Sequence, residues 1–157
     1  MARASSLLQR VVTYLLPVLL LAACDSGAGK PYLSIVGGGF VFNYRLATAD
    51  YGFVARVMRS LPEGSVVEAQ FENPAGGEPI VLREDSKPGR TSYVFQTPPL
   101  EGVQANHDYL VVLRVLGEGG RELARYEKRF HSDVDQSVLP GSAPVVGPGY
   151  QRAPPPQ

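Results

Sequence analysis

The chain has 157 residues, a formal net charge of zero, no tryptophan and one cysteine. Its fifteen Lys and Arg residues are balanced by fifteen Asp and Glu residues and form no basic stripe, which argues against a nucleic-acid-binding protein. A single cysteine excludes an intrachain disulfide, a multi-cysteine zinc site and a CxxC redox pair. The folded part must therefore be stabilised by packing.

The first 24 residues have the layout of a secretory signal peptide. Arg3 and Arg10 make the start positive, an apolar run follows over residues 11–23, and small side chains precede Cys24. A membrane-spanning helix needs about 20 apolar residues, so this run is too short for a permanent transmembrane anchor. The rest of the chain has 13 basic and 15 acidic residues, which is a mild excess of negative charge.

The end of this segment, Leu21-Ala22-Ala23-Cys24, resembles the lipobox of bacterial lipoproteins, with Leu three residues before the cysteine and small residues next to it. The alternative is an ordinary signal peptide in which Cys24 lies near the cut site by chance. The resemblance implies that residues 1–23 are removed and that Cys24 carries a diacylglyceryl thioether, often with a further chain such as palmitate on its amine. Two or more acyl chains anchor a protein stably to a membrane.

The lipobox resemblance also implies a location. The protein would be lipid-anchored in the cell envelope, facing the periplasm, with membrane lipid as its first partner. Asp25 follows the cysteine and resembles an inner-membrane retention signal of enterobacterial lipoproteins. We therefore expect attachment to the inner membrane in preference to the outer membrane.

The mature chain divides by composition into three parts. Residues 24–30 form a lipidated cysteine and a small polar tether, too poor in apolar groups to fold. Residues 31–132 have the size of one domain. Residues 133–157 are rich in proline and glycine and are predicted to form a disordered tail.

Within the domain, apolar and polar residues alternate with the period of two that is typical of β-strands. The inner row of the second segment is predicted to be Phe40, Phe42, Tyr44 and Leu46. Residues 49–60 also fit a helix, but Gly52 and the aromatic and β-branched content favour a strand. The predicted strands are 32–36, 40–47, 51–58, 65–72, 79–84, 91–97, 108–116 and 121–131.

Eight short strands separated by turn-forming residues predict an all-β fold, an antiparallel immunoglobulin-like β-sandwich of about seven to eight strands. The hairpin formed by residues 109–130 resembles the last two strands of an immunoglobulin-like or fibronectin type III-like domain. The resemblance places Tyr109 at a tyrosine corner, buried and with its hydroxyl bonded to nearby backbone. Antibody-type domains are excluded, because tryptophan and an inter-sheet disulfide are missing.

Two motifs invite a functional interpretation. Gly37-Gly38-Gly39 follows a strand-like run as phosphate-binding loops do, but the strand-like sequence after it favours a bulge or a passage between sheets. His131-Ser132-Asp133 contains the residue types of a hydrolytic triad. Adjacent residues of a strand point to opposite sides, so we expect a strand end followed by a polar segment.

Isolated acids and histidines offer weaker signals. His107 with Asp108 would supply half of a metal site, and no further ligand follows at a recognisable spacing. The acidic pairs Glu68 with Glu72 and Glu84 with Asp85 are typical of solvated strand faces, and nothing in the sequence sets them across a cleft. No metal, cofactor or catalytic residue is predicted.

The remaining candidate is an aromatic and basic surface. Tyr51 and Phe53 lie close to Arg56 and Arg59, and aromatic and Arg side chains dominate interface hot spots. These four residues are the candidate partner surface, and core packing of the aromatics is the default expectation against which it is set.

Together these features predict a non-catalytic binding or structural module, anchored by lipid on Cys24 and contacting an envelope protein. The sandwich loops or an open sheet edge would provide the contact surface. The alternative is a small-ligand carrier or an enzyme whose site is assembled from dispersed loop residues.

Overall fold

The computed structural model describes residues 29–146 and 151–152. The predicted signal peptide, Cys24 and most of the predicted tether lie outside the described residues. The folded domain belongs to the unit that begins at Pro31.

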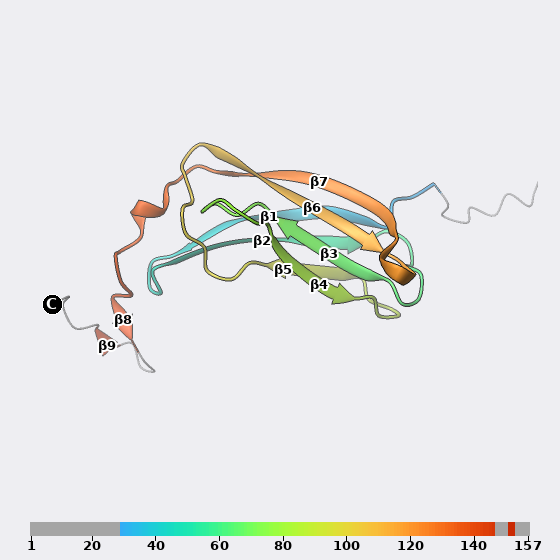
Figure 1. Ribbon diagram of the computed structural model, residues 1–157. Coiled ribbons are helices and arrows are strands. Elements are labelled where there is room, and N and C mark those ends of the chain that lie inside the picture. Colours follow the sequence, from blue (N-terminus) through green and yellow to red (C-terminus); the bar gives the residue numbers. More distant parts are fainter. Residues whose placement is uncertain (1–28, 147–150, 153–157) are drawn as a thin grey trace, which may run out of the picture. The chain divides into compact units, whose positions relative to one another are not determined.

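Seven strands form two antiparallel sheets (Figure 1). The three-stranded sheet has the order β1-β2-β5 and the four-stranded sheet the order β4-β3-β6-β7. The strands are β1 (Leu33–Asn43), β2 (Thr48–Val57), β3 (Val66–Phe71), β4 (Ile80–Asp85), β5 (Ser92–Gln96), β6 (His107–Leu116) and β7 (Glu122–Ser132). The predicted immunoglobulin-like β-sandwich is confirmed. The fourth strand pairs with the third, whereas in constant-type antibody domains it joins the first sheet.

The two layers meet through an aromatic core. Tyr51 stacks on Phe40 with ring centroids 4.5 Å apart and meets Phe71 of the opposite sheet edge-on at 5.0 Å. Phe53 packs on both Phe95 and Phe130. Because these rings interleave across the sandwich, they fill the space between the sheets and fix the layers relative to each other.

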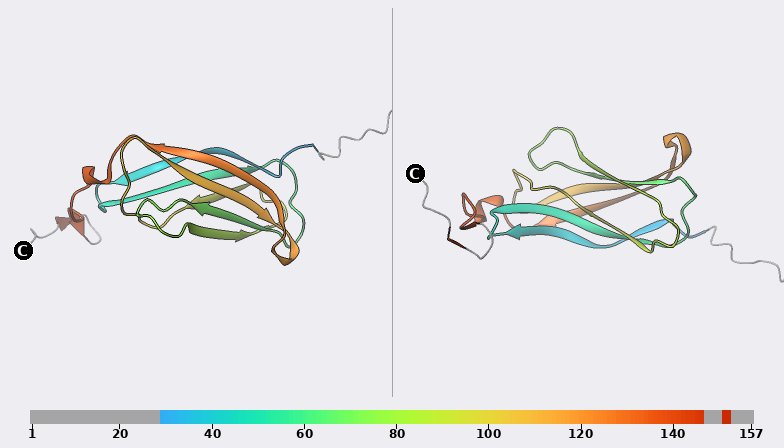
Figure 2. Two further views of the ribbon diagram at one scale, coloured as in Figure 1. Left: turned by 45° about the horizontal axis from the view of Figure 1, so that its top comes forward. Right: turned by 90° about the horizontal axis from the view of Figure 1, so that it is seen from below.

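The first two predicted strands are one strand. β1 runs through Gly37-Gly38-Gly39, and its register with β2 shifts between Ile35 and Gly37. The bulge therefore lies at Val36, directly before the glycines, which pair regularly with β2. At Gly38 a Cβ would lie only 2.4 Å from the Gly52 carbonyl oxygen, which explains why glycine is needed there. β1 lies beside β7 of the other sheet at one side of the sandwich (Figure 2).

The predicted inner row of this strand is correct for two residues and wrong for two. Phe40 and Phe42 pack against the core. Tyr44 and Leu46 are exposed, because β1 ends at Asn43 and residues 44–47 form the turn to β2. The Asn43 side chain closes this turn by accepting a hydrogen bond from the Leu46 N–H at 3.1 Å.

The predicted disordered tail is partly ordered. After Ser132 the chain forms a short 3-10 helix, Gln136–Val138, and Leu139 packs against the core. The Gln136 side chain donates to the Leu100 carbonyl at 2.7 Å and accepts from the Val103 N–H at 3.2 Å. The domain therefore extends to about residue 139.

After Leu139, β8 (Val145–Val146) pairs antiparallel with β9 (Gln151–Arg152). The prediction of a wholly unstructured tail is wrong for these residues as well. The other residues after 146 lie outside the described part of the chain.

Candidate functional site

The predicted partner surface is wrong for its two aromatic residues. Tyr51 and Phe53 are 0% and 2% exposed, because the inner face of β2 carries residues 49, 51, 53 and 55. Arg56 is exposed on the outer face of β2. Arg59 lies beyond the strand, with its guanidinium 3.6 Å from the centre of the Tyr32 ring. These four residues form no common surface.

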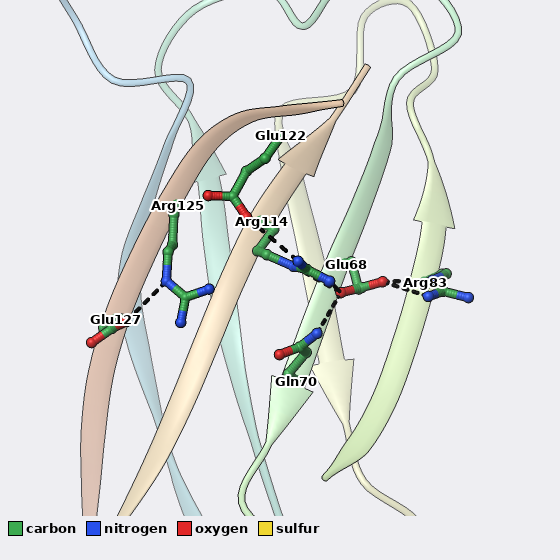
Figure 3. Close-up of polar contacts among 7 residues, drawn as sticks. All are labelled: Glu68, Gln70, Arg83, Arg114, Glu122, Arg125 and Glu127. Carbon is green, nitrogen blue, oxygen red and sulfur yellow. Dashed lines mark hydrogen bonds and ion pairs between the residues drawn. The ribbon is translucent and has the colours of Figure 1, made fainter. Parts of the chain in front are cut away.

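The most elaborate polar cluster of the described domain lies on the outer face of the four-stranded sheet (Figure 3). Glu68 occupies the middle of β3, and its register places Arg83 of β4 on one side and Arg114 of β6 on the other. Arg125 of β7 lies opposite Arg114. We call this surface the arginine face. It comprises Arg83, Arg114 and Arg125 with Glu68, Glu122 and Glu127.

Glu68 holds the arginine face together. Its side chain is 0% exposed, although it points away from the core, because the neighbouring polar side chains cover it. Oε2 accepts from both Nε and Nη2 of Arg83 at 2.7 Å. Oε1 accepts from Gln70 at 2.8 Å and from Nε and Nη2 of Arg114, the Nε contact being 2.9 Å. Both carboxylate oxygens are therefore saturated by donors.

The charges of the cluster set its protonation state. Burial by itself raises the pKa of Glu68, but the hydrogen bonds from Arg114, Arg83 and Gln70 and the charge of Arg114 outweigh burial and hold it below its ordinary value. The same contacts with Glu68 raise the pKa of Arg114. Glu68 is therefore ionised at neutral pH and acts as a fixed counter-charge for both arginines.

The rim of the face is more open to solvent. The Arg83 side chain is 65% exposed, and Arg125, 45% exposed, bonds Glu127 at 2.9 Å. Val81, also exposed, lies opposite Gln70 on β4. The arrangement gives ordered guanidinium groups beside an apolar side chain, all carried by rigid strands.

The histidine motifs do not assemble a catalytic or metal centre. His131 Nδ1 lies 2.7 Å from Asp108 Oδ1, whereas Ser132 is buried and its hydroxyl donates to the Val134 carbonyl. The predicted strand end is confirmed, and His131-Ser132-Asp133 does not form a triad. Within residues 29–146 and 151–152, no group of three or more His, Cys, Asp or Glu residues is placed to hold a metal ion.

In each predicted acidic pair, at least one carboxylate binds a partner of its own and does not act together with the other. Glu72 accepts from the Leu110 N–H at 2.7 Å, and Glu84 pairs with Arg90 at 2.5 Å. Neither faces another carboxylate across a cleft in these contacts. Glu72 and Glu84 are therefore surface residues of their strands, as the sequence predicts. Glu68 differs, because its carboxylate is buried and bound by two arginines.

A hollow of about 620 Å³ lies between two loops near the start of β1. Apolar Val57 and Leu61 contribute to its wall together with Lys87 and Arg90. His107 is not among its lining residues, so the structure does not bring the histidines into this concavity. Its volume falls in the range of small-molecule sites, about 300–1,000 Å³.

The fold and the arginine face define a seven-stranded immunoglobulin-like sandwich with a charge cluster on one sheet. No protein-family model matches the chain, and neither a curated protein nor a solved structure matches it. The sequence alone misses the cluster, because Glu68, Arg83 and Arg114 are far apart along the chain. The only available signal is that Glu68 and Arg114 each interrupt a largely apolar stretch of their strand, whereas Arg83 begins the charged end of β4.

Proposed function

We propose that this protein is a lipid-anchored binding module of the bacterial cell envelope that contacts a partner protein through the arginine face. The observation that carries the proposal is the immobilisation of Arg83 and Arg114 by the buried carboxylate of Glu68. Arginine is enriched at interface hot spots, and its ordering normally costs free energy on binding. Here much of that ordering has already occurred during folding.

The comparison of the two outer faces supports this choice of surface. The outer face of the three-stranded sheet includes Gly39 and Gly52, which pair with each other and offer no side chain to a partner. On the arginine face, the exposed side chains of Arg83, Arg125 and Val81 surround the ordered pair of Glu68 and Arg114. A partner surface that combines carboxylates with an apolar patch fits these groups.

The anchoring part of the proposal rests on the lipobox resemblance. Residues 24–30 span at most about 3.5 Å each, so they would hold the domain within about 25 Å of the lipid. In the part of the chain that the structure describes, no helix is long and apolar enough to cross a membrane. The lipid on Cys24 would attach the domain to the membrane, and the domain would face the periplasm.

Two measurements test the proposal separately. Fatty-acid labelling of the wild type and of Cys24→Ser tests the anchor, and equal labelling of both chains would contradict it. Site-specific photocrosslinking in intact cells tests the surface. We expect a partner adduct with the probe at 81 or 125 and none with the probe at 41, where Val41 is similarly exposed on the other sheet. Equal adducts at 41 would contradict the assignment of the arginine face.

The hollow favours a second candidate, a small-ligand carrier or an enzyme with a loop-built site. Its apolar wall suits an apolar or amphipathic ligand, whereas its charges are mixed, since Lys87 and Glu63 both line it and Arg90 is paired with Glu84. Native mass spectrometry of the purified full-length chain tests this candidate. A bound small molecule that is lost in Leu61→Arg would favour the carrier, and an unliganded spectrum together with surface crosslinks at 81 would favour the binding module.

A further inference from the structure

The strand β5 is an edge of the three-stranded sheet. It pairs only with β2 among the described strands. Just outside its ends, the Thr91 carbonyl accepts from the Val57 N–H, and the Thr97 N–H donates to the Tyr51 carbonyl. Backbone groups of successive residues alternate in direction along an antiparallel strand. The odd-numbered residues of this stretch therefore face β2, and the even-numbered ones turn to the open side.

The open side is the row Ser92, Val94 and Gln96. At the start of this row the Ser92 carbonyl accepts a hydrogen bond from Arg90 Nε at 2.9 Å. The Val94 side chain is 59% exposed, the largest exposure among the exposed large hydrophobic residues described. Val94 thus presents an unpaired N–H and C=O together with an accessible apolar side chain.

The other three edge strands of the two sheets, β4, β7 and β1, have features that disfavour pairing with a strand of another molecule. β4 ends with the charged residues Arg83, Glu84 and Asp85, and β7 alternates charges over residues 125–129. β1 is bulged and lies beside β7. Edge strands are normally blunted by charges, prolines or bulges. The sequence of β5, Ser-Tyr-Val-Phe-Gln, contains none of these, and only the Ser92 carbonyl at its start is covered, by Arg90.

The sequence of β5 is nearly the same in both directions. Read from Val94 outward, each side has an aromatic residue and then an uncharged polar residue. In a two-fold symmetric antiparallel pair centred on Val94, that residue meets its own copy, and Ser92 meets Gln96 of the second chain. The inward-facing aromatics, Tyr93 and Phe95, also lie opposite each other.

We propose that β5 is the interface between two copies of this chain, which join edge to edge through antiparallel β5 strands and form one continuous six-stranded sheet from the two three-stranded sheets. The occupant is a second copy because the sequence of β5 is nearly the same in both directions, so that the strand is complementary to itself. The proposal does not depend on lipid attachment or on the arginine face.

The oligomeric state of the full-length chain, purified in mild detergent, tests the proposal by analytical ultracentrifugation. We expect a concentration-dependent dimer for the wild type and for Val94→Thr, which keeps the backbone N–H and the branched side chain. Val94→Pro removes an N–H that faces away from β2 and is expected to be monomeric with its circular dichroism unchanged. A monomeric wild type, or a dimeric Val94→Pro, would overturn the proposal.

Disulfide crosslinking decides the matter even if Val94→Pro fails to fold. Val94→Cys is expected to form a dimer-sized adduct on oxidation, because residues directly opposite in an antiparallel pair have Cβ atoms about 5 Å apart. The matched control is Val81→Cys, on the charged edge β4, and the wild type reports any background from Cys24. Equal adducts for the two variants, or an adduct of Val94→Cys with another protein, would contradict pairing with a second copy.

Discussion

The phenolic oxygen of Tyr109 accepts a hydrogen bond from the backbone N–H of Gln104 at 2.8 Å, five residues upstream. Its ring is buried at the start of β6, with 2% of the residue exposed. The ring thus packs in the core while the hydroxyl fixes the loop that enters the strand. The predicted tyrosine-corner geometry at Tyr109 is confirmed.

Two substitutions separate the contributions of this residue. Tyr109→Phe removes only the hydrogen bond and is expected to lower the free energy of unfolding by about 1 kcal/mol. Tyr109→Ala also removes a buried ring and is expected to lower it by about 3–5 kcal/mol. Urea unfolding measures both values. An unchanged midpoint for the alanine variant would show that the corner does not stabilise the domain.

Glu68 is expected to be important for stability because it neutralises two arginines. Glu68→Gln keeps the shape of the side chain but leaves Arg83 and Arg114 without their counter-charge, and we expect a loss of about 3 kcal/mol. The control is Glu127→Gln, which removes the exposed partner of Arg125 and is expected to cost at most about 1 kcal/mol. Equal losses in chemical denaturation would contradict the special position of Glu68.

The lowered pKa of Glu68 also predicts an acid-dependent loss of stability. Because the pKa is lower in the folded chain than the ordinary value of 4.5, the carboxylate contributes stability above that value. This contribution disappears as the pH falls through the folded-state pKa. The stability difference between wild type and Glu68→Gln is therefore expected to shrink on acidification below about pH 4.5. A difference that stays constant down to the acid limit would count against ionised Glu68.

The glycine triplet in β1 is predicted to tolerate substitution unevenly. A Cβ at Gly38 would meet the Gly52 carbonyl oxygen at 2.4 Å and Phe130 at 2.7 Å, whereas no atom lies within 4 Å of a Cβ at Gly39. Gly38→Ala is expected to lower the free energy of unfolding by about 1–3 kcal/mol through overpacking. Gly39→Ala, measured by thermal unfolding, serves as the control, and a larger loss there would contradict the close packing of β1.

The segment after β7 is predicted to be part of the folding unit. Deleting residues 140–157 should leave the unfolding midpoint unchanged. Deleting 134–157 also removes Gln136, whose contacts with Leu100 and Val103 are worth about 1 kcal/mol each, and we expect a loss of about 2–3 kcal/mol. Calorimetry of both truncations distinguishes the two boundaries, and identical midpoints would restore a domain end near residue 132.

The sequence by itself determined the strands and the class of fold. Alternation of apolar and polar residues is a local property of a strand, so β6 and β7 are predicted nearly to their observed ends. Turn residues mark where the chain reverses, and Tyr109 carries the corner. An irregularity at the glycine triplet is also predicted, because glycines inside a strand pattern favour one, and the observed bulge lies directly before the triplet, at Val36.

Only the tertiary structure decided which side of each strand faces the core. On β2 the period of two separates Tyr51 and Phe53 from Arg56 but does not say that the aromatics are inside, since that depends on the opposite sheet. The arginine face depends in the same way on register. Glu68 meets Arg114, 46 residues later, only because β3 pairs with β6 at one alignment. A shift by one residue would turn every side chain to the other face, and no local pattern encodes that choice.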